Sequence, residues 1–164
     1  NYKGLEKNLS YVQLGDYPTP LLSCNALSSR YQNTRLYLKQ DGLTGMMQHR
    51  GRDFGGNKLR KLEYLLADAC AHGYTSVLTF GCAGSNHALQ TAWCARSLGL
   101  QAISMLAPQP NSQVVRKNLL LQQYVGADIY YAANRQHVGF LTPAVCSIYK
   151  QRYGSVPYII PTGG

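Results

Sequence analysis

The chain has 164 residues, which is enough for one sizeable hydrophobic core, or for one domain and part of another. Sixteen lysines and arginines against seven acidic residues give a formal net charge of +9, which indicates either a basic surface without a specific partner or a phosphate-bearing ligand or nucleic acid. The sequence contains no apolar run of about 18 residues, so we expect no transmembrane helix, and it shows no signal peptide.

The positive charge is scattered, apart from one basic cluster between Arg50 and Lys61. No recognition helix, zinc-finger spacing or aromatic RNA-binding signature accompanies this cluster. A basic nucleic-acid-binding domain is therefore the weaker interpretation of the charge, and we expect no nucleic-acid partner.

The cysteines and histidines indicate neither disulfides nor a metal site. Five cysteines without a CxxC pair are typical of free, buried thiols in a reducing compartment, so we expect a cytoplasmic protein. The four histidines show no ligand spacing with the cysteines, and we expect no bound metal.

The first part of the chain predicts short elements separated by turns. The apolar period of Leu59, Leu62 and Leu66 indicates a helix, which Gly73 ends. In chain order we expect an extended segment at 18–20, a short helix at 21–31, a strand at 35–39, a turn at 41–45, a loop at 46–53 and a helix from 58 to about 72.

From residue 75 onward the pattern becomes regular, with short apolar runs alternating with helical periods. We expect strands at 76–80, 101–107, 128–131 and 157–160, and helices at 85–98, 112–124 and 138–151. Because strands alternate with helices, the sequence predicts an α/β fold with a parallel sheet and helices on both of its faces.

The helix that begins near Lys58 carries the first chemical signal. The preceding pair Gly55-Gly56 lets the backbone pass close to a ligand, and Asn57 can cap the helix. The helix N-terminus and the neighbouring Arg60 and Lys61 disfavour a further positive charge at Lys58. Schiff-base chemistry needs a lysine that can lose its proton. On spacing alone, the alternative is a solvated surface lysine.

The second signal is the stretch Gly81–His87, between the end of a predicted strand and the start of a helix. Ligands of parallel sheets bind at the carboxyl ends of strands, and helix N-termini attract anions. Ser85, Asn86 and His87 present a hydroxyl, an amide and a ring nitrogen in succession. The stretch is neither GxGxxG nor a P-loop, so a dinucleotide or ATP site lacks support. Ser85 could also be a simple N-cap, and His87 a polar residue of the first turn.

Both stretches resemble the 1-aminocyclopropane-1-carboxylate deaminase/D-cysteine desulfhydrase family. Gly55–Glu63, followed by Leu65–Ala69, resembles the family's pyridoxal-phosphate lysine motif. Other segments resemble the family in the same order and cover nearly the whole chain: Pro18–Leu21, Tyr37–Lys39, Asp41, Leu43–Gly45, Gly84–His87, Asn118–Leu121, Gly126-Ala127, Pro157–Pro161 and Gly163-Gly164.

The resemblance implies a tryptophan-synthase-β-like fold, which is fold type II of the pyridoxal-phosphate enzymes. It implies a lyase or deaminase that releases ammonia from a small amino acid, such as D-cysteine or 1-aminocyclopropane-1-carboxylate. By the same resemblance Lys58 forms a Schiff base with pyridoxal 5'-phosphate and acts as acid/base, Ser85 is a nucleophile or proton acceptor, and Asn86 hydrogen-bonds the cofactor's 3-hydroxyl. The implied cofactor-binding set also contains Asn57, Lys61 near the phosphate, and His87.

The resemblance also implies a domain organisation. Residues 1–51 would be the N-terminal part of a larger cofactor domain, 52–155 the smaller α/β domain, and 156–164 a return into the larger one. The chain is therefore expected to be truncated, with the phosphate cradle and the partner of the pyridine nitrogen beyond residue 164, and to form a homodimer when complete.

Three features depart from the family's pattern. The family usually has two acidic residues where this chain has Asp41-Gly42, and the segment 46–53 has no familiar counterpart. Histidine at position 87 is closer to the desulfhydrase branch, because deaminases tend to have glutamine there. The alternatives that stay open are another fold-type-II enzyme, either a β-replacement synthase or a racemase, and a non-catalytic fragment or binding module.

Overall fold

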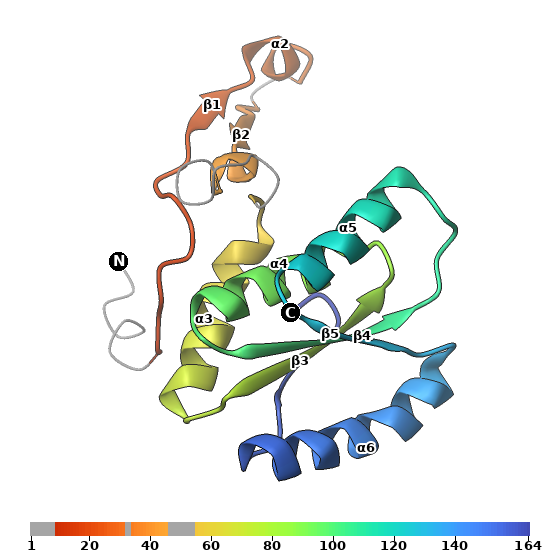
Figure 1. Cartoon of the computed structure of the whole chain (residues 1–164). Helices are drawn as coiled ribbons and strands as arrows, with labels where there is room; N and C mark the ends of the chain where they lie inside the picture. Colours follow the sequence, from red (N-terminus) through yellow and green to blue (C-terminus); the bar gives the residue numbers. More distant parts are fainter. Residues whose placement is uncertain (1–8, 32–33, 46–54) are drawn as a thin grey trace. The chain divides into compact units, whose positions relative to one another are not determined.

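The structure is a computed structural model that describes residues 9–31, 34–45 and 55–164. It divides into two compact units, one of residues 14–60 and one of residues 1–13 with 61–164 (Figure 1). The loop predicted at 46–53 lies outside the described residues. In the part of the chain that is described, no helix is both long and apolar enough to cross a bilayer.

The unit of residues 14–60 contains a short antiparallel ribbon. Strand β1 (Leu21–Ser23) pairs with strand β2 (Tyr37–Lys39). Helix α2 (Asn25–Ser28) lies between the two strands in the chain, and a 3-10 turn (Asp41–Leu43) follows β2. The helix predicted at 21–31 is therefore wrong for Leu21–Ser23, which form β1, and is confirmed only for Asn25–Ser28. Leu21 and Leu22 pair with Lys39 and Leu38 of β2. A short apolar run does not by itself distinguish a strand from a helix.

Residues 61–164, all of which are described, are built around a parallel sheet with the strand order β5-β4-β3-β6. The strands are β3 (Ser76–Cys82), β4 (Gln101–Ala107), β5 (Asp128–Tyr131) and β6 (Tyr158–Ile160). The predicted parallel sheet and its four strands are confirmed. β3 and β4 are the two central strands, each of seven residues, and β3 hydrogen-bonds to β4 on one edge and to β6 on the other.

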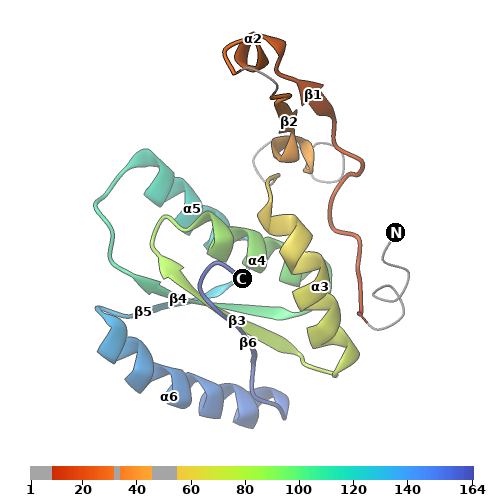
Figure 2. The ribbon, with the colours of Figure 1, turned by 180° about the vertical axis from the view of Figure 1, so that it is seen from behind.

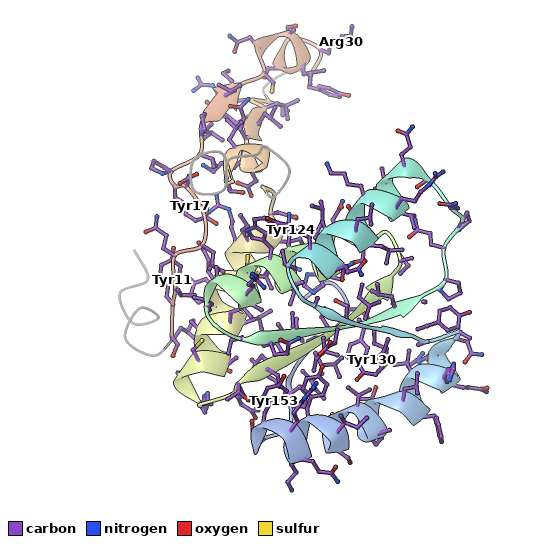
Figure 3. All side chains as sticks on the ribbon, viewed as in Figure 1. Tyr11, Tyr17, Arg30, Tyr124, Tyr130 and Tyr153 are labelled. Atoms are coloured by element: carbon purple, nitrogen blue, oxygen red, sulfur yellow. The ribbon has the colours of Figure 1, made fainter. Side chains whose placement is uncertain are left out.

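Helices cover both faces of this sheet, as predicted. α4 (Asn86–Ser97) and α5 (Gln113–Tyr124) lie on one face and α6 (Arg135–Tyr153) on the other (Figures 1 and 2). On the α6 side, Leu78, Ile103 and Met105 of the sheet pack against Val145 and Tyr149. Tyr130 and Tyr153 lie on this side as well (Figure 3).

The helix boundaries follow their capping residues. Ser112 caps α5 by accepting a hydrogen bond from the Val115 N–H at 3.2 Å. α6 starts three residues earlier than the predicted 138, because the Asn134 carboxamide accepts from the His137 N–H and caps the helix there. Gly154 ends α6 in the left-handed conformation, with φ of 82°.

All five cysteines lie in the described part and are free thiols, as expected. The expectation that they are buried is wrong for Cys70 and Cys82, which are exposed. Cys82 is the last residue of β3 and lies at the carboxyl edge of the sheet.

The path of the chain creates a reversal at β3. From β3 through α4, β4 and α5 to β5 the chain moves along one face of the sheet, and α6 then returns across the other face to place β6 beside β3. In such doubly wound sheets, ligands bind outside the carboxyl ends of the strands at the point of reversal. The fold therefore points to the ends of β3 and β6.

Two tyrosines, the buried Tyr149 and the half-buried Tyr158, pair with carboxylates in the unit of residues 61–164. The hydroxyl of Tyr149 donates to Asp128, and burial together with this bond raises the pKa of Tyr149. The Tyr158 hydroxyl donates to Asp68 Oδ2 at 2.9 Å, and burial followed by this hydrogen bond raises the pKa of Tyr158 to about 12.

We expect Tyr158→Phe to flatten the loss of stability at alkaline pH. An unfolded tyrosine ionises near about pH 10, whereas folded Tyr158 keeps its proton to about pH 12. Its contribution is complete below about pH 10 and is lost as the pH rises, by at most about 1.4 kcal/mol per pH unit. Urea unfolding at several alkaline pH values measures the slope. Tyr124→Phe, at a tyrosine that is 77% exposed, is the control and should keep the wild-type slope; an unchanged slope in Tyr158→Phe would contradict the assignment.

Candidate active site

A pocket of about 720 Å³ opens at the reversal point of the sheet. Its walls come from the carboxyl ends of β3, β4 and β6 and from the first turn of α6. Phe80, Met105 and Ile159 make these walls apolar, while Ser85 and His87 supply polar groups. An apolar pocket with a few convergent polar side chains is the usual form of a small-molecule site.

Ser85 stands at the N-terminus of α4, where the predicted cap is confirmed. Its Oγ accepts a hydrogen bond from the Ala88 N–H at 3.2 Å. The side chain packs closely over the end of β3, since a Cβ added to Gly81 would lie 2.7 Å from both Cβ and Oγ of Ser85. Glycine at position 81 is thus what allows the Ser85 hydroxyl to sit against the strand end.

The backbone N–H and the backbone carbonyl of Gly84 are both held by side chains that lie further along the chain. Its N–H donates to Gln109 Oε1 at 2.9 Å, and its carbonyl accepts from Asn118 Nδ2 at 2.8 Å. Asn118 Nδ2 also donates to Asn86 Oδ1 at 2.9 Å. The turn that carries Ser85 and Asn86 is therefore a fixed framework, whose conformation depends on two residues outside it.

His87 and Lys61 meet at the C-terminal glycines. His87 is 5% exposed and lines the pocket. Lys61 Nζ donates to the carbonyl oxygens of Gly163 at 2.8 Å and Gly164 at 3.3 Å. A Cβ added to Gly164 would lie 3.3 Å from both His87 Cε1 and Lys61 Cδ, so the backbone passes close to both side chains.

Lys58 begins helix α3 (Lys58–Ala71) and belongs to the unit of residues 14–60. The turn before it is clamped by Thr44, which is fully buried. Thr44 Oγ1 accepts from the Gly56 N–H at 2.8 Å and donates to the Asp41 carbonyl at 2.9 Å. A Cβ added to Gly55 would lie 2.5 Å from the Gly42 carbonyl oxygen, so only glycine fits there.

Arg60 is paired within the same unit. Its Nη2 and Nε donate to the two carboxylate oxygens of Asp41 at 2.8 and 3.1 Å, and its guanidinium lies 4.6 Å from the centre of the Tyr17 ring. The hydrogen bond from Arg60 holds the pKa of the Asp41 carboxyl below its usual value. The charge crowding that the sequence predicts beside Lys58 is weaker for this reason, because Asp41 balances the charge of Arg60.

The predicted site residues thus divide between the two units. Lys61, Ser85, Asn86 and His87 lie in the unit of residues 61–164, whereas Lys58 and the exposed Asn57 lie in the unit of residues 14–60. Sequence reasoning did not single out Asn118, Gln109 or Thr44 as site residues. The available signal for Asn118 was a polar residue on the buried face of α5, in step with Val115 and Gln122.

The sequence of this chain matches, over residues 12–153, a family described as pyridoxal-phosphate-dependent enzymes. The chain belongs to this family, whose cofactor is pyridoxal 5'-phosphate. This confirms the resemblance, the fold type and the cofactor that the sequence implied.

Individual relatives make the family assignment more specific. The chain is 32% identical over 159 residues to the bifunctional D-cysteine desulfhydrase/1-aminocyclopropane-1-carboxylate deaminase of Arabidopsis thaliana, covering 92% of this chain and 38% of that protein. It is 34% identical over 155 residues to the D-cysteine desulfhydrase of Yersinia enterocolitica, with 89% and 43% covered. The crystal structure of an ACC deaminase homologue superposes with a TM-score of 0.78 at 33% identity, covering 98% of this chain and 47% of that one. The chain spans less than half the length of these relatives.

We expect Thr44→Val to destabilise the unit that carries Lys58. Valine keeps the shape of threonine but leaves the half-buried Gly56 N–H without its acceptor, which costs about 1 kcal/mol. The free energy of unfolding from urea titration, followed by a probe in this unit, measures the loss. Thr34→Val, at an exposed threonine of the same unit, is the control; an equal effect of both variants would show that the clamp contributes nothing.

Proposed function

We propose that this protein is a pyridoxal-phosphate-dependent lyase or deaminase that releases ammonia from a small amino acid of the D-cysteine or 1-aminocyclopropane-1-carboxylate type. The observation that carries the proposal is the turn of residues 84–87, from which the Ser85 hydroxyl and the His87 imidazole line the apolar pocket at the reversal point of the sheet. The names of the relatives support the substrate class.

The residues present fit this cofactor. Its planar ring needs apolar walls, which Phe80, Met105 and Ile159 supply. Its anionic groups need donors and cations. The N-terminus of α4 with Asn86 offers the first, and Lys61 offers the second. We propose that Lys58 provides the amine that binds the cofactor, that Asn86 hydrogen-bonds the ring oxygen, and that Asn57, Lys61 and His87 complete its surroundings.

When bound, the cofactor supplies an electron sink for the bond that breaks next to the substrate nitrogen. The chain's own residues supply proton transfer and exclusion of water. The Lys58 amine accepts and returns a proton. The Ser85 hydroxyl uses one lone pair as a helix cap and keeps a second lone pair and its proton for the substrate. The apolar walls keep water from the reacting atoms.

The two alternative enzymes, a β-replacement synthase and a racemase, would use the same cofactor but form different products. A β-replacement synthase would consume a second substrate, and a racemase would release nothing. Incubation of the protein with a panel of D- and L-amino acids, with and without an added thiol as second substrate, separates these activities when keto acid, ammonia, sulfide, replacement product and inversion of configuration are all assayed. Absence of any product with pyridoxal phosphate bound would favour the non-catalytic module. We also propose a cytoplasmic homodimer, in keeping with the free thiols.

We expect Lys58→Ala to abolish the visible absorbance of the bound cofactor and the adduct that borohydride traps, because both require the Lys58 amine. Mass spectrometry of the reduced and digested protein locates the adduct. Lys150→Ala, at an exposed lysine in the last turn of α6, is the control and should keep both signals. An adduct on any other lysine of the wild-type protein would refute the assignment of Lys58.

We expect Ser85→Ala to keep the trapped adduct but to reduce turnover about 100-fold or more, the usual effect of losing an acid/base group. Loss of the cap also lowers stability by about 1 kcal/mol. Ser112→Ala is the matched control, since Ser112 caps α5 at the same distance of 3.2 Å. It should lower stability similarly and leave turnover intact. If the two variants behave alike in turnover, Ser85 is only a cap.

A further inference from the structure

Asn118 reaches the predicted site from a different helix. It lies on α5, is 3% exposed, and directs its carboxamide at the turn of residues 84–87. Its Nδ2 donates one hydrogen bond to the Gly84 carbonyl and one to Asn86 Oδ1, at 2.8 and 2.9 Å. Both protons of the same amino group are therefore used on this turn.

The identity of each atom in this chain of bonds follows from the backbone. A carbonyl oxygen can only accept, so the atom of Asn118 that faces Gly84 has to be the nitrogen. The second proton of that nitrogen points at the Asn86 carboxamide, which has to present its oxygen. Gln109 Oε1 accepts a hydrogen bond from the Gly84 N–H at 2.9 Å. This bond helps to fix the orientation of Gly84, whose carbonyl accepts from Asn118.

These hydrogen bonds determine which atom of the Asn86 carboxamide faces Asn118 and which faces away from it. With Oδ1 occupied by Asn118, the group that Asn86 has left for another partner is its NH2, which only donates. An amide that could turn over freely would present its oxygen part of the time, and that oxygen would repel an anionic oxygen of a ligand. A donor of fixed orientation is what an anionic ring oxygen requires.

We propose that Asn118 is a positioning residue that fixes the Asn86 carboxamide with its NH2 toward the oxygen on the cofactor ring. This inference rests on the proposed function. The competing explanation is that Asn118 only ties α5 to the turn, with no effect on what Asn86 offers to a ligand.

The geometry is tested first without cofactor. In the protein produced from its complete coding sequence and labelled at asparagine, the Asn118 NH2 protons should exchange slowly with water in NMR spectra. Asn86→Ala, at an exposed position, should release one of them and leave the other protected by Gly84. The Asn134 carboxamide, whose oxygen caps α6, is the matched control and should exchange fast. Fast exchange of both Asn118 protons would overturn the proposal.

The chemical role is tested with pyridoxal phosphate bound. We expect Asn118→Leu, which removes both donors at similar volume, to raise the pH midpoint of the cofactor's visible absorbance by about one pH unit, as expected for one lost hydrogen bond. Asn86→Ala should raise it by a similar amount. The double variant should show no more than the Asn86→Ala shift, because Asn118 acts only through Asn86.

The outcomes are distinct. Additive shifts, or no shift in Asn118→Leu, would reduce Asn118 to a structural tie. Borohydride trapping on the same wild-type sample tests the proposed function: without an adduct on Lys58 that function fails, whereas an adduct with additive shifts refutes only the positioning role. If Asn118→Leu does not fold, Asn118→Asp keeps the size and removes the donors, and its shift is again compared with and without Asn86→Ala.

Discussion

The central strand β3 is the constraint on which the larger unit depends. It pairs in parallel with β4 along its whole length and with β6 along part of it. Parallel strands run in the same direction and are joined by crossovers, so their carboxyl ends all lie at one edge of the sheet. The return of α6 to the other face places the end of β6 beside the end of β3. The pocket forms at this edge, because the connections after β3 and β5 run over opposite faces of the sheet.

The two predicted halves of the site are built in the same way. Each has a glycine turn that leads into a helix, and each turn is held by a buried polar side chain from another segment. Thr44 holds the turn before Lys58, and Asn118 holds the turn before Asn86. Glycine is required at Gly55 and Gly81, where a Cβ would collide with backbone or with Ser85. A turn built from glycine has little conformational preference of its own, so its shape has to come from such partners.

The regular part of the fold could be predicted because its signals are local. Ser85 and Ser112 cap helices, and short apolar runs mark the strands between them. β1 could not be predicted, since its pairing with β2 is decided across the hairpin and not within three residues. The start of α6 had a local signal in Asn134, but the apolar period begins only at Val138.

The candidate site was predictable only as far as its residues are consecutive. Ser85, Asn86 and His87 follow each other in the chain, and the sequence predicts them together. Asn118 contacts Asn86 and Gly84 across 32 and 34 residues, and Arg60 meets Asp41 across 19. Such partners are set by how α5 packs and how the turn folds back. No pattern in a single sequence encodes them, although a polar residue on a buried helix face marks the place to look.

The cap formed by Ser85 connects the structural and the proposed chemical role of this residue. The Ala88 N–H points at Oγ, and the first turn of α4 carries about half a positive charge. Both favour negative charge on the oxygen over the neutral hydroxyl. A serine that is to lose its proton during a reaction is therefore better placed at a helix N-terminus than on a loop. The hydrogen bond that begins α4 would also stabilise negative charge that develops on the Ser85 oxygen. A side chain that accepts this hydrogen bond but has no hydroxyl proton would therefore preserve the cap without the proposed chemistry. The cap of α4 and the proposed reactivity of Ser85 thus depend on the same interaction, and they differ in whether the oxygen carries its proton.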